Sequence, residues 1–214
     1  GWVIFESNGH LYNYFPIGSS IVAIPFVAIA VLFGASVPAI NPELQVFIAA
    51  TLSALNLLLM YALARIFVSR TSSLLLSIGF WAGTSLSSSG GTALWSHLPA
   101  VVMAFVALFL LARYRSGMTP LQAVALGIAL FGAYISRPSM FVFVAFVIVV
   151  LGLWNWRRAV ISGSTAALLF AIFTAWSWGE YATMLPPYYM PNRLADGDFL
   201  TAMIGTTISP ARGL

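Results

Sequence analysis

The chain has 214 residues, of which 61% are hydrophobic and only 7% are charged, and its net charge is +4. Soluble globular domains carry roughly 25% charged residues, so this composition excludes a soluble fold and indicates an integral membrane protein. All nine basic residues are arginine, and they form no cluster on a polar face, which excludes a nucleic-acid-binding surface. No polar stretch is long enough for a separate soluble domain, so we expect residues 1–214 to form a single transmembrane domain.

Seven apolar runs follow one another along the chain, and a helical span needs about 20 mostly apolar residues. The runs cover residues 17–35, 44–68, 74–86, 97–112, 121–136, 140–154 and 159–178. The third run is short and becomes polar at its far end. We therefore expect an all-α polytopic membrane protein with about six transmembrane helices plus one juxtamembrane or re-entrant helix.

The first run is the one that we assign to the juxtamembrane or re-entrant helix. Pro25 lies in its middle and would kink a helix. The preceding ESNGHLYNYFP carries no arginine and is rich in tyrosine, as is typical of a segment at the membrane interface. A plain kinked span is the alternative.

Arginine pairs predict the topology of the remaining runs. Positive residues mark the cytoplasmic side of a membrane protein. Arg65 and Arg70 bracket the end of the second run, Arg113 and Arg115 follow the fourth, and Arg157 and Arg158 follow the sixth. Two runs separate each pair from the next, so all three pairs lie on one face. Residues from 179 onward are then expected outside.

Arg137 is the only charged side chain between Leu121 and Trp156. As one helix this stretch would be about 54 Å long, nearly twice a hydrocarbon core of about 30 Å. It must fold as a hairpin, and Pro138 marks the break because proline disfavours helix in the preceding residue. Arg137 is therefore expected at the outer membrane surface. There it either extends to the headgroups and caps helix carbonyls or binds an anion such as phosphate.

Several other polar residues are expected on the same outer face, where loops of a helical bundle can assemble a site. The candidates for substrate binding, besides Arg137, are His10, Tyr12, Tyr14, His97 and Glu180. Each has a structural alternative. His97 can be a hydrogen-bonded interface histidine, His10 a solvated loop residue and Glu180 a helix cap, and these are the preferred readings of the residues taken singly.

No familiar catalytic spacing is present in the sequence. It lacks H-E-x-x-H, a Walker loop, G-x-S-x-G and C-x-x-C. Asp196 and Asp198 could bind a cation, but ADGD in a loop is more often a solvated turn. The sequence therefore identifies no cofactor, no metal site and no catalytic residue.

One segment near the start of the chain resembles a known family. NGHLYNYFPIGSSIVAIPF resembles the stretch after the first outer loop in bacterial members of the GT-C glycosyltransferase superfamily, with its pattern DG-x-x-Y-x-x-x-P-P-G. Asn8-Gly9, Tyr12, Pro16 and Gly18 match this pattern, and Ile17 replaces the second proline.

Three further segments resemble the same family in the same order. GTSLSSSGGTALWSHLPA resembles the next outer loop, in which a Ser-His pair, here Ser96 and His97, opens a helix. GIALFGAYISRPS resembles a helix that ends in a basic residue and a proline, here Arg137 and Pro138. TISPARGL resembles the S-P-x-R-G-L that precedes a further helix. The series spans nearly the whole chain.

The resemblance implies a polytopic enzyme, similar to protein O-mannosyltransferases and the lipid A aminoarabinose transferase. Such an enzyme takes a sugar from a polyprenyl-phosphate carrier, the donor substrate, at the outer membrane face. It inverts the anomeric carbon and uses an aspartate of the first outer loop as general base. Arg137 is the residue that fits a clamp on the leaving phosphate. The aspartate would precede Gly1, so we expect a fragment that lacks the catalytic loop and is inactive alone.

The expected location is the inner membrane of a bacterium, with the site facing the periplasm or exterior. The expected partners are membrane lipid, the polyprenyl-phosphate sugar and other membrane subunits, without nucleic acid. The alternative function is a non-catalytic integral membrane subunit that packs in a larger membrane complex, which fits the missing catalytic carboxylates. A transporter ranks last, because no internal repeat is visible.

Overall fold

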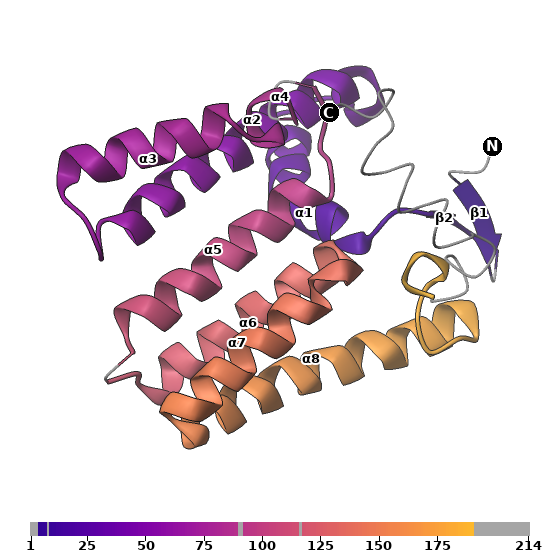
Figure 1. Ribbon diagram of the computed structural model, residues 1–214. Coiled ribbons are helices and arrows are strands. Elements are labelled where there is room, and N and C mark those ends of the chain that lie inside the picture. Colours follow the sequence, from indigo (N-terminus) through magenta and orange to yellow (C-terminus); the bar gives the residue numbers. More distant parts are fainter. Residues whose placement is uncertain (1–3, 8, 90–91, 116, 191–214) are drawn as a thin grey trace, which may run out of the picture. The chain divides into compact units, whose positions relative to one another are not determined.

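A computed structural model describes residues 4–7, 9–89, 92–115 and 117–190 (Figure 1). The chain divides into two compact units. Unit 1 combines residues 1–14 with residues from 176 onward, and unit 2 comprises residues 15–175. The described chain is predominantly α-helical, which confirms the expected class, although it also contains one small β-hairpin.

The β-hairpin belongs to unit 1 and was not expected from the sequence. Strands β1 (Ile4–Ser7) and β2 (His10–Asn13) pair antiparallel, with Ser7 opposite His10. Gly9 has a φ of 76°, a conformation that glycine adopts without steric cost. The rest of the described unit 1 consists of the last turns of α8 (Trp156–Tyr181) and the short helix η2 (Pro187–Tyr189).

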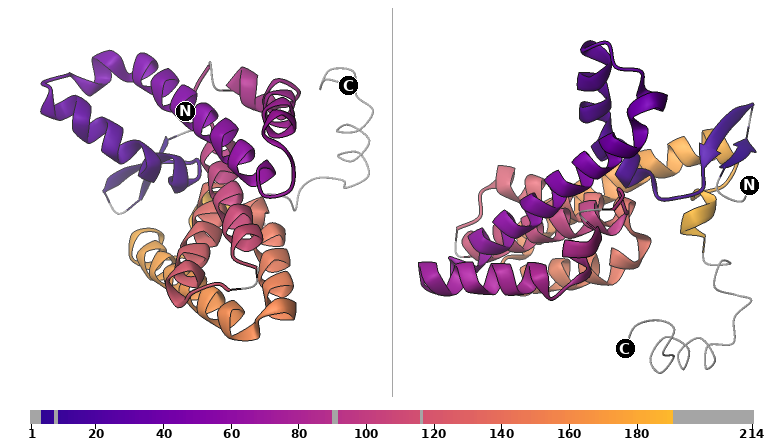
Figure 2. Two further views of the ribbon diagram at one scale, coloured as in Figure 1. Left: turned by 90° about the vertical axis from the view of Figure 1, so that its left-hand side faces the viewer. Right: turned by 90° about the horizontal axis from the view of Figure 1, so that it is seen from above.

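Unit 2 is built from helices whose positions follow the apolar runs of the sequence. The bounds are α1 (Ile17–Leu32), α2 (Val37–Ala64), α3 (Arg70–Ala82), α4 (Ser85–Ser89), α5 (His97–Arg113), α6 (Pro120–Ser136), η1 (Pro138–Met140), α7 (Phe141–Trp154) and α8 up to Ala175. Helices α6, α7 and α8 run side by side (Figures 1 and 2).

Two buried clusters form the core of unit 2. One joins α5, α6, α7 and the start of α8, and Leu126, Leu130 and Val147 are fully buried in it. The other joins α2 to α4 and α5 through Ile48 and Leu98. Small residues let these helices approach closely, as is usual between helices in membranes. A Cβ on Gly127 would lie 2.5 Å from the carbonyl oxygen of Ser162, so α6 and α8 touch there.

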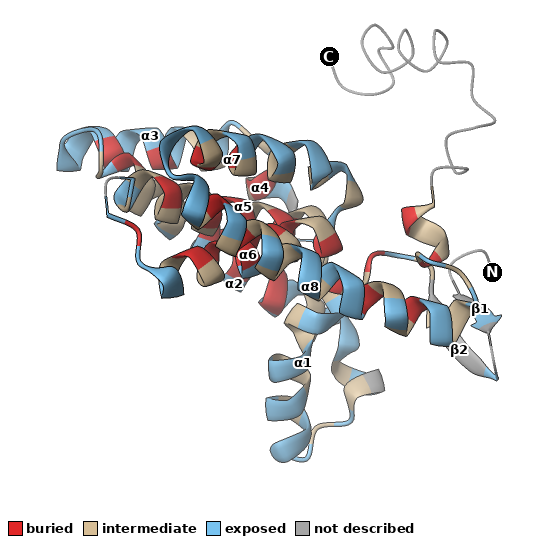
Figure 3. Ribbon diagram, turned by 90° about the horizontal axis from the view of Figure 1, so that it is seen from below, coloured by how far each residue is buried: buried red, intermediate tan, exposed pale blue. Residues whose placement is uncertain are grey.

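The outward faces of unit 2 are apolar as well. Phe33 is 87% exposed and Leu153 is 81% exposed, and pale-blue exposed surface covers much of α1, α3 and α7 (Figure 3). Two helical segments, Ala39–Ala64 and Trp156–Tyr181, are long and apolar enough to cross a membrane. Only 28% and 17% of their most apolar windows are buried, whereas the core helix of a soluble protein would be mostly buried.

The other apolar helices are shorter. Ile17–Leu32, His97–Arg113, Pro120–Ser136 and Pro138–Trp154 each fall below the length of a full span. In the described chain, two helices are therefore long and apolar enough to cross a membrane. The arrangement of about six spans plus a juxtamembrane helix stays a prediction. The single transmembrane domain over residues 1–214 also stays a prediction.

Two arginine pairs lie at the same end of unit 2. The guanidinium of Arg115, in the α5–α6 turn, lies 4.6 Å from the ring centroid of Trp154 at the end of α7. Trp154 precedes the pair Arg157 and Arg158 by only three positions in the chain. The α2–α3 turn, with the third pair, lies on the same side (Figure 1). The α6–α7 turn lies at the opposite end of α6, about 25 Å away for a helix of this length.

Candidate functional site

Arg137 occupies the turn between α6 and α7. Its backbone is extended, with φ −152° and ψ 108°, and Pro138 opens the following 3-10 turn. Its N–H donates to the Ala133 carbonyl at 3.0 Å, and its own carbonyl accepts from the Met140 N–H at 2.9 Å. The predicted Arg-Pro break is confirmed. Because both backbone groups are bonded within the turn, the residue's position is fixed while its side chain is exposed.

The start of α1 packs directly on the end of α6, one residue before Arg137. A Cβ on Gly18 would lie 2.5 Å from Ser136 Cα and 2.7 Å from its backbone nitrogen, so only glycine fits. Ser136 is buried, and its hydroxyl donates to the Gly132 carbonyl at 2.8 Å. The Pro16 cap supplies no side-chain hydrogen bond to the first turn of α1. The contact therefore brings the start of α1 to the arginine turn.

His97 is the first residue of α5, as the Ser-His pair predicted. Its half-buried imidazole stacks on the Trp95 ring, with centroids 6.4 Å apart and planes inclined by 17°. Burial lowers the pKa of His97, and the positive charge of Arg137 lowers it further. The structure thus brings together two of the candidate residues, His97 and Arg137, which are 40 positions apart in the sequence.

A buried asparagine of α2 forms a hydrogen bond to the backbone at the start of α5. Asn56 of α2 is fully buried, and its amide donates to the Leu98 carbonyl at 3.3 Å. Its Oδ1 has no hydrogen-bond partner among the described residues. A second bond in the same layer runs from Trp81 Nε1 to the Ser53 hydroxyl at 2.8 Å. The first contact joins α2 to α5 one residue after His97, and the second joins α3 to α2. None of the residues that make these contacts was among the candidates from the sequence.

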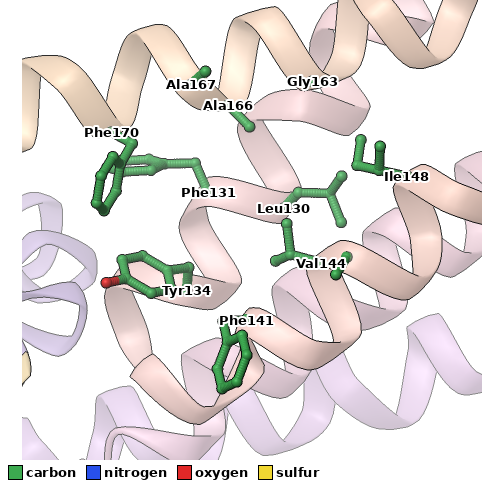
Figure 4. Close-up of a pocket in the computed structure, with 11 residues that line it drawn as sticks. Leu130, Phe131, Tyr134, Phe141, Val144, Ile148, Gly163, Ala166, Ala167 and Phe170 are labelled. Atoms are coloured by element: carbon green, nitrogen blue, oxygen red, sulfur yellow. The ribbon is translucent and has the colours of Figure 1, made fainter. Parts of the chain in front are cut away.

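An apolar groove of about 300 Å³ lies between α6, α7 and α8 (Figure 4). Leu130, Phe131 and Tyr134 line it from α6, and Phe141, Val144 and Ile148 line it from α7. Gly163, Ala166, Ala167 and Phe170 complete it from α8. Tyr134 and Phe141 lie at one end of the groove, and Arg137 stands between them in the chain. The groove was not predicted from the sequence, because three separate helices form it.

Unit 1 holds the other described candidates. The Tyr12 hydroxyl donates to the Glu180 carboxylate. The Tyr12 ring lies 4.9 Å from the ring of Tyr181, which in turn contacts Trp176 at 5.6 Å. The bond to Glu180, with partial burial and the charge of that carboxylate, raises the pKa of Tyr12 from 10 to about 12. Glu180 therefore holds the hairpin to the end of α8.

The remaining candidates of unit 1 lie close to this contact in the chain. The ring of Tyr14 lies 5.7 Å from that of Tyr188, at an edge-to-face angle of 71°. His10 is the first residue of β2, and its side chain lies outside the described part. Asp196, Asp198 and the TISPARGL segment also lie outside the described residues.

The six candidate residues therefore belong to two groups. Arg137 and His97 belong to unit 2, and His10, Tyr12, Tyr14 and Glu180 belong to unit 1. The first group offers a cation and an imidazole on which the charge of that cation acts. The second offers aromatic rings around a carboxylate. Comparison with protein-family models, with curated proteins and with solved structures gave no match, so the assignment of a function rests on these residues.

Proposed function

We propose that the chain is the carrier-binding part of a membrane glycosyltransferase, which moves a sugar from a polyprenyl-phosphate carrier to an acceptor. The proposal places the protein in a bacterial inner membrane, with the Arg137 turn facing the periplasm or exterior. The chemistry is that of a GT-C enzyme. The arginine pairs at the opposite end of unit 2 support this orientation, because positive residues mark the cytoplasmic side.

The observation that carries the proposal is the meeting of three motif segments. Gly18, His97 and Arg137 come from segments that resemble the same superfamily and lie far apart in the sequence. Gly18 has no room for a side chain against Ser136, and the charge of Arg137 reaches His97. This meeting at one end of the bundle is what a shared site built from the three segments would require.

Arg137 would stabilise the leaving group of the reaction. Breaking the bond between the sugar and the carrier leaves additional negative charge on the carrier phosphate. A guanidinium presents paired N–H donors in a geometry that matches phosphate oxygens. Glu43 is the only acidic residue between positions 15 and 175, so few carboxylates in unit 2 can compete for the arginine. A preorganised cation of this kind lowers the barrier to departure.

The general base of the proposed reaction lies outside the described residues. Of the described carboxylates, Glu43 is exposed near the start of α2, Glu180 is engaged with Tyr12 and Glu6 is exposed on β1, and we assign the role to none of them. The proposal therefore assigns carrier binding and leaving-group stabilisation to this chain, and proton abstraction to a carboxylate elsewhere in the full-length protein.

The direct test is sugar transfer by the reconstituted full-length protein from radiolabelled polyprenyl-phosphate sugar. Arg137→Ala is expected to lower the rate about 100-fold, the usual cost of removing one donor to a developing negative charge. Arg137→Lys should recover part of the rate, because it keeps the charge but loses the paired geometry.

Arg113→Ala is the matched control, since Arg113 is an exposed arginine at the other end of the bundle. It should leave the rate unchanged. Equal rates for Arg137→Ala and the unmodified protein would contradict the assignment of Arg137 as the residue that stabilises the leaving phosphate. Absence of transfer by the unmodified protein would favour a non-catalytic membrane subunit, for which the extensive exposed apolar surface provides packing area.

A further inference from the structure

The α5–α6 and α7–α8 turns meet at one end of unit 2, at the lower left of Figure 1. Both turns are anchored in the same buried cluster, which contains Met118 from the first turn and Leu151 and Ala159 from either side of the second. The buried hydroxyl of Ser162 in α8 donates to the Ala123 carbonyl of α6 at 2.8 Å, which joins the same two regions. Packing therefore holds the two turns side by side.

Three arginines belong to these two turns. Arg115 lies in the α5–α6 turn, and Arg157 and Arg158 lie at the start of α8. The Arg115 guanidinium lies over the Trp154 ring, 4.6 Å from its centroid, and Trp154 is only three positions before Arg157. The Arg158 backbone N–H donates to the Asn155 side chain at 3.3 Å, which fixes the first turn of α8. The cations of the two turns are therefore neighbours.

Unit 2 offers almost no negative charge to balance these cations. Glu43 is the only acidic residue between positions 15 and 175, and about 30 Å of α2 separates it from the end of that helix that lies on the arginine side. The ring contacts leave donors available, because a guanidinium stacks through its face and keeps its N–H groups in its own plane. Arg115 over Trp154 and Arg157 over Trp156 can therefore still bind an anion.

The surface beside the cations is apolar and exposed. Leu121, at the start of α6, is 77% exposed, and Trp156, at the start of α8, is 65% exposed. Leu153 at the end of α7 is exposed as well. Tryptophan is enriched at the level of the lipid headgroups, where its ring contacts both the headgroups and the acyl chains. Cations next to such side chains suit an anion that carries hydrocarbon chains.

We propose that the two turns form a binding site for cardiolipin, a phospholipid with two phosphates joined by a glycerol bridge. One phosphate contacts Arg115, the other contacts Arg157 and Arg158, and the acyl chains lie against the exposed apolar side chains. Basic sites between helices bind headgroups of this kind in membrane proteins. A lipid with one phosphate would occupy only one of the two sets of donors. The site goes beyond the proposed function, because it lies at the opposite end of unit 2 from Arg137.

The test measures equilibrium binding of fluorescently labelled cardiolipin to the purified full-length protein in detergent, without any sugar. A double variant that combines Arg115→Gln with Arg158→Gln removes one cation from each turn. It should weaken binding at least about tenfold, because each guanidinium–phosphate contact joins opposite charges. Arg113 is kept in every variant, since it lies in the last turn of α5, where a positive charge stabilises the helix.

The matched control combines Arg65→Gln with Arg70→Gln. It removes the same charge from the same end of unit 2, but from the α2–α3 turn, where the Arg65 guanidinium donates to the Val68 carbonyl at 2.8 Å. The control should change cardiolipin binding by no more than about twofold, as surface substitutions do. Equal weakening by the two double variants would show that net charge alone attracts the lipid, and would overturn the inference.

Competition with other phospholipids tests the match between two phosphates and two turns. Phosphatidylglycerol with the same acyl chains carries one phosphate on the same glycerol chemistry. At equal phosphate concentration it should displace labelled cardiolipin at least about ten times less effectively than unlabelled cardiolipin does, because it contacts one turn only. Phosphatidylcholine should not displace it. Equal displacement by phosphatidylglycerol would overturn the inference.

Photo-crosslinking of the unmodified protein keeps the test decisive if the arginine variants fail to fold. A photoreactive cardiolipin should label the peptides that contain the α5–α6 and α7–α8 turns. Labelling confined to the α2–α3 turn, or spread evenly over the apolar helices, would overturn the inference. If cardiolipin binds as expected but the protein transfers no sugar, the proposed function fails and the cardiolipin site stands.

Discussion

Tyr12 and Glu180 are separated by 168 positions in the chain, and they meet through a hydrogen bond. The phenol donates and the carboxylate accepts, so the contact requires a protonated tyrosine. Aromatic neighbours surround the pair, with Tyr181 beside Tyr12. The candidate role of Tyr12 in substrate binding stays a prediction, whereas its contact with Glu180 explains why a tyrosine is needed at this position for structure.

The Tyr12–Glu180 contact should be lost at high pH. The pKa of Tyr12 is raised in the folded protein from 10 to about 12. Its contribution to stability is therefore complete below pH 10 and is lost as the pH rises to about 12. Hydrogen exchange of the β1–β2 amides, measured against those of α6 at the same pH, should show the hairpin opening first. Equal exchange in both elements would contradict this.

Replacing Glu180 by glutamine keeps an acceptor for the Tyr12 hydroxyl but removes the charge. In Glu180→Gln the pKa of Tyr12 should fall only part of the way toward 10, because the hydrogen bond, which is the largest cause of the upward shift, is kept while the charge of the carboxylate is removed. Titration of tyrosine ultraviolet absorbance, with Tyr12→Phe identifying the Tyr12 signal, measures the change. An unaltered titration would show that the charge of Glu180 makes no contribution to the raised pKa of Tyr12.

At the scale of elements, α1 depends on one glycine for its place beside α6. Gly18→Ala would bring a Cβ within 2.5 Å of Ser136 Cα, so the two helices must separate. We expect the free energy of unfolding to fall by about 1–3 kcal/mol, the usual range for overpacking. Denaturation in detergent, followed by circular dichroism, measures this.

Gly79→Ala is the matched control for this change. Gly79 lies on an exposed face of α3, and a Cβ added there would have no other atom within 4 Å, so alanine fits. It should raise stability slightly, by up to about 1 kcal/mol, because alanine has the higher helix propensity. If Gly18→Ala proves as harmless as Gly79→Ala, the close packing of α1 on α6 is wrong.

The helices could be predicted from the sequence because each apolar run is bounded by a clear signal. Pro138 predicted the α6–α7 break, and the Ser96-His97 pair predicted the start of α5. The β-hairpin was missed, although Asn8-Gly9 is a frequent hairpin turn. Its strands are only four residues long, which leaves too few positions for a two-residue alternation to be recognised.

The candidate site could be predicted only in part, because its contacts join distant segments. The sequence pointed to Arg137 and His97 through their positions at helix ends. The groove could not be predicted, since Ala166 and Phe170 are ordinary apolar helix residues until α6 and α7 lie opposite them. The role of Asn56 could not be predicted either, because its hydrogen bond to the Leu98 carbonyl forms only when α2 and α5 pack together.

At the scale of the whole molecule, composition predicted a membrane protein, and the exposed apolar faces agree with that. The membrane orientation is the assumption on which the proposed function depends. The α6–α7 turn and the α5–α6 turn lie at opposite ends of α6, so the length of one helix separates them. The proposed function requires the Arg137 turn outside and the arginine pairs in the cytoplasm.

The measurement that tests this most directly is thiol accessibility in intact cells, for which the absence of native cysteine gives a clean background. Ser139→Cys marks the exposed α6–α7 turn, and Gly117→Cys marks the α5–α6 turn, where a side chain meets nothing within 4 Å. The account predicts that a membrane-impermeant reagent labels Ser139→Cys and spares Gly117→Cys until the cells are broken. The reverse pattern would contradict the orientation and, with it, the proposed phosphate clamp at Arg137.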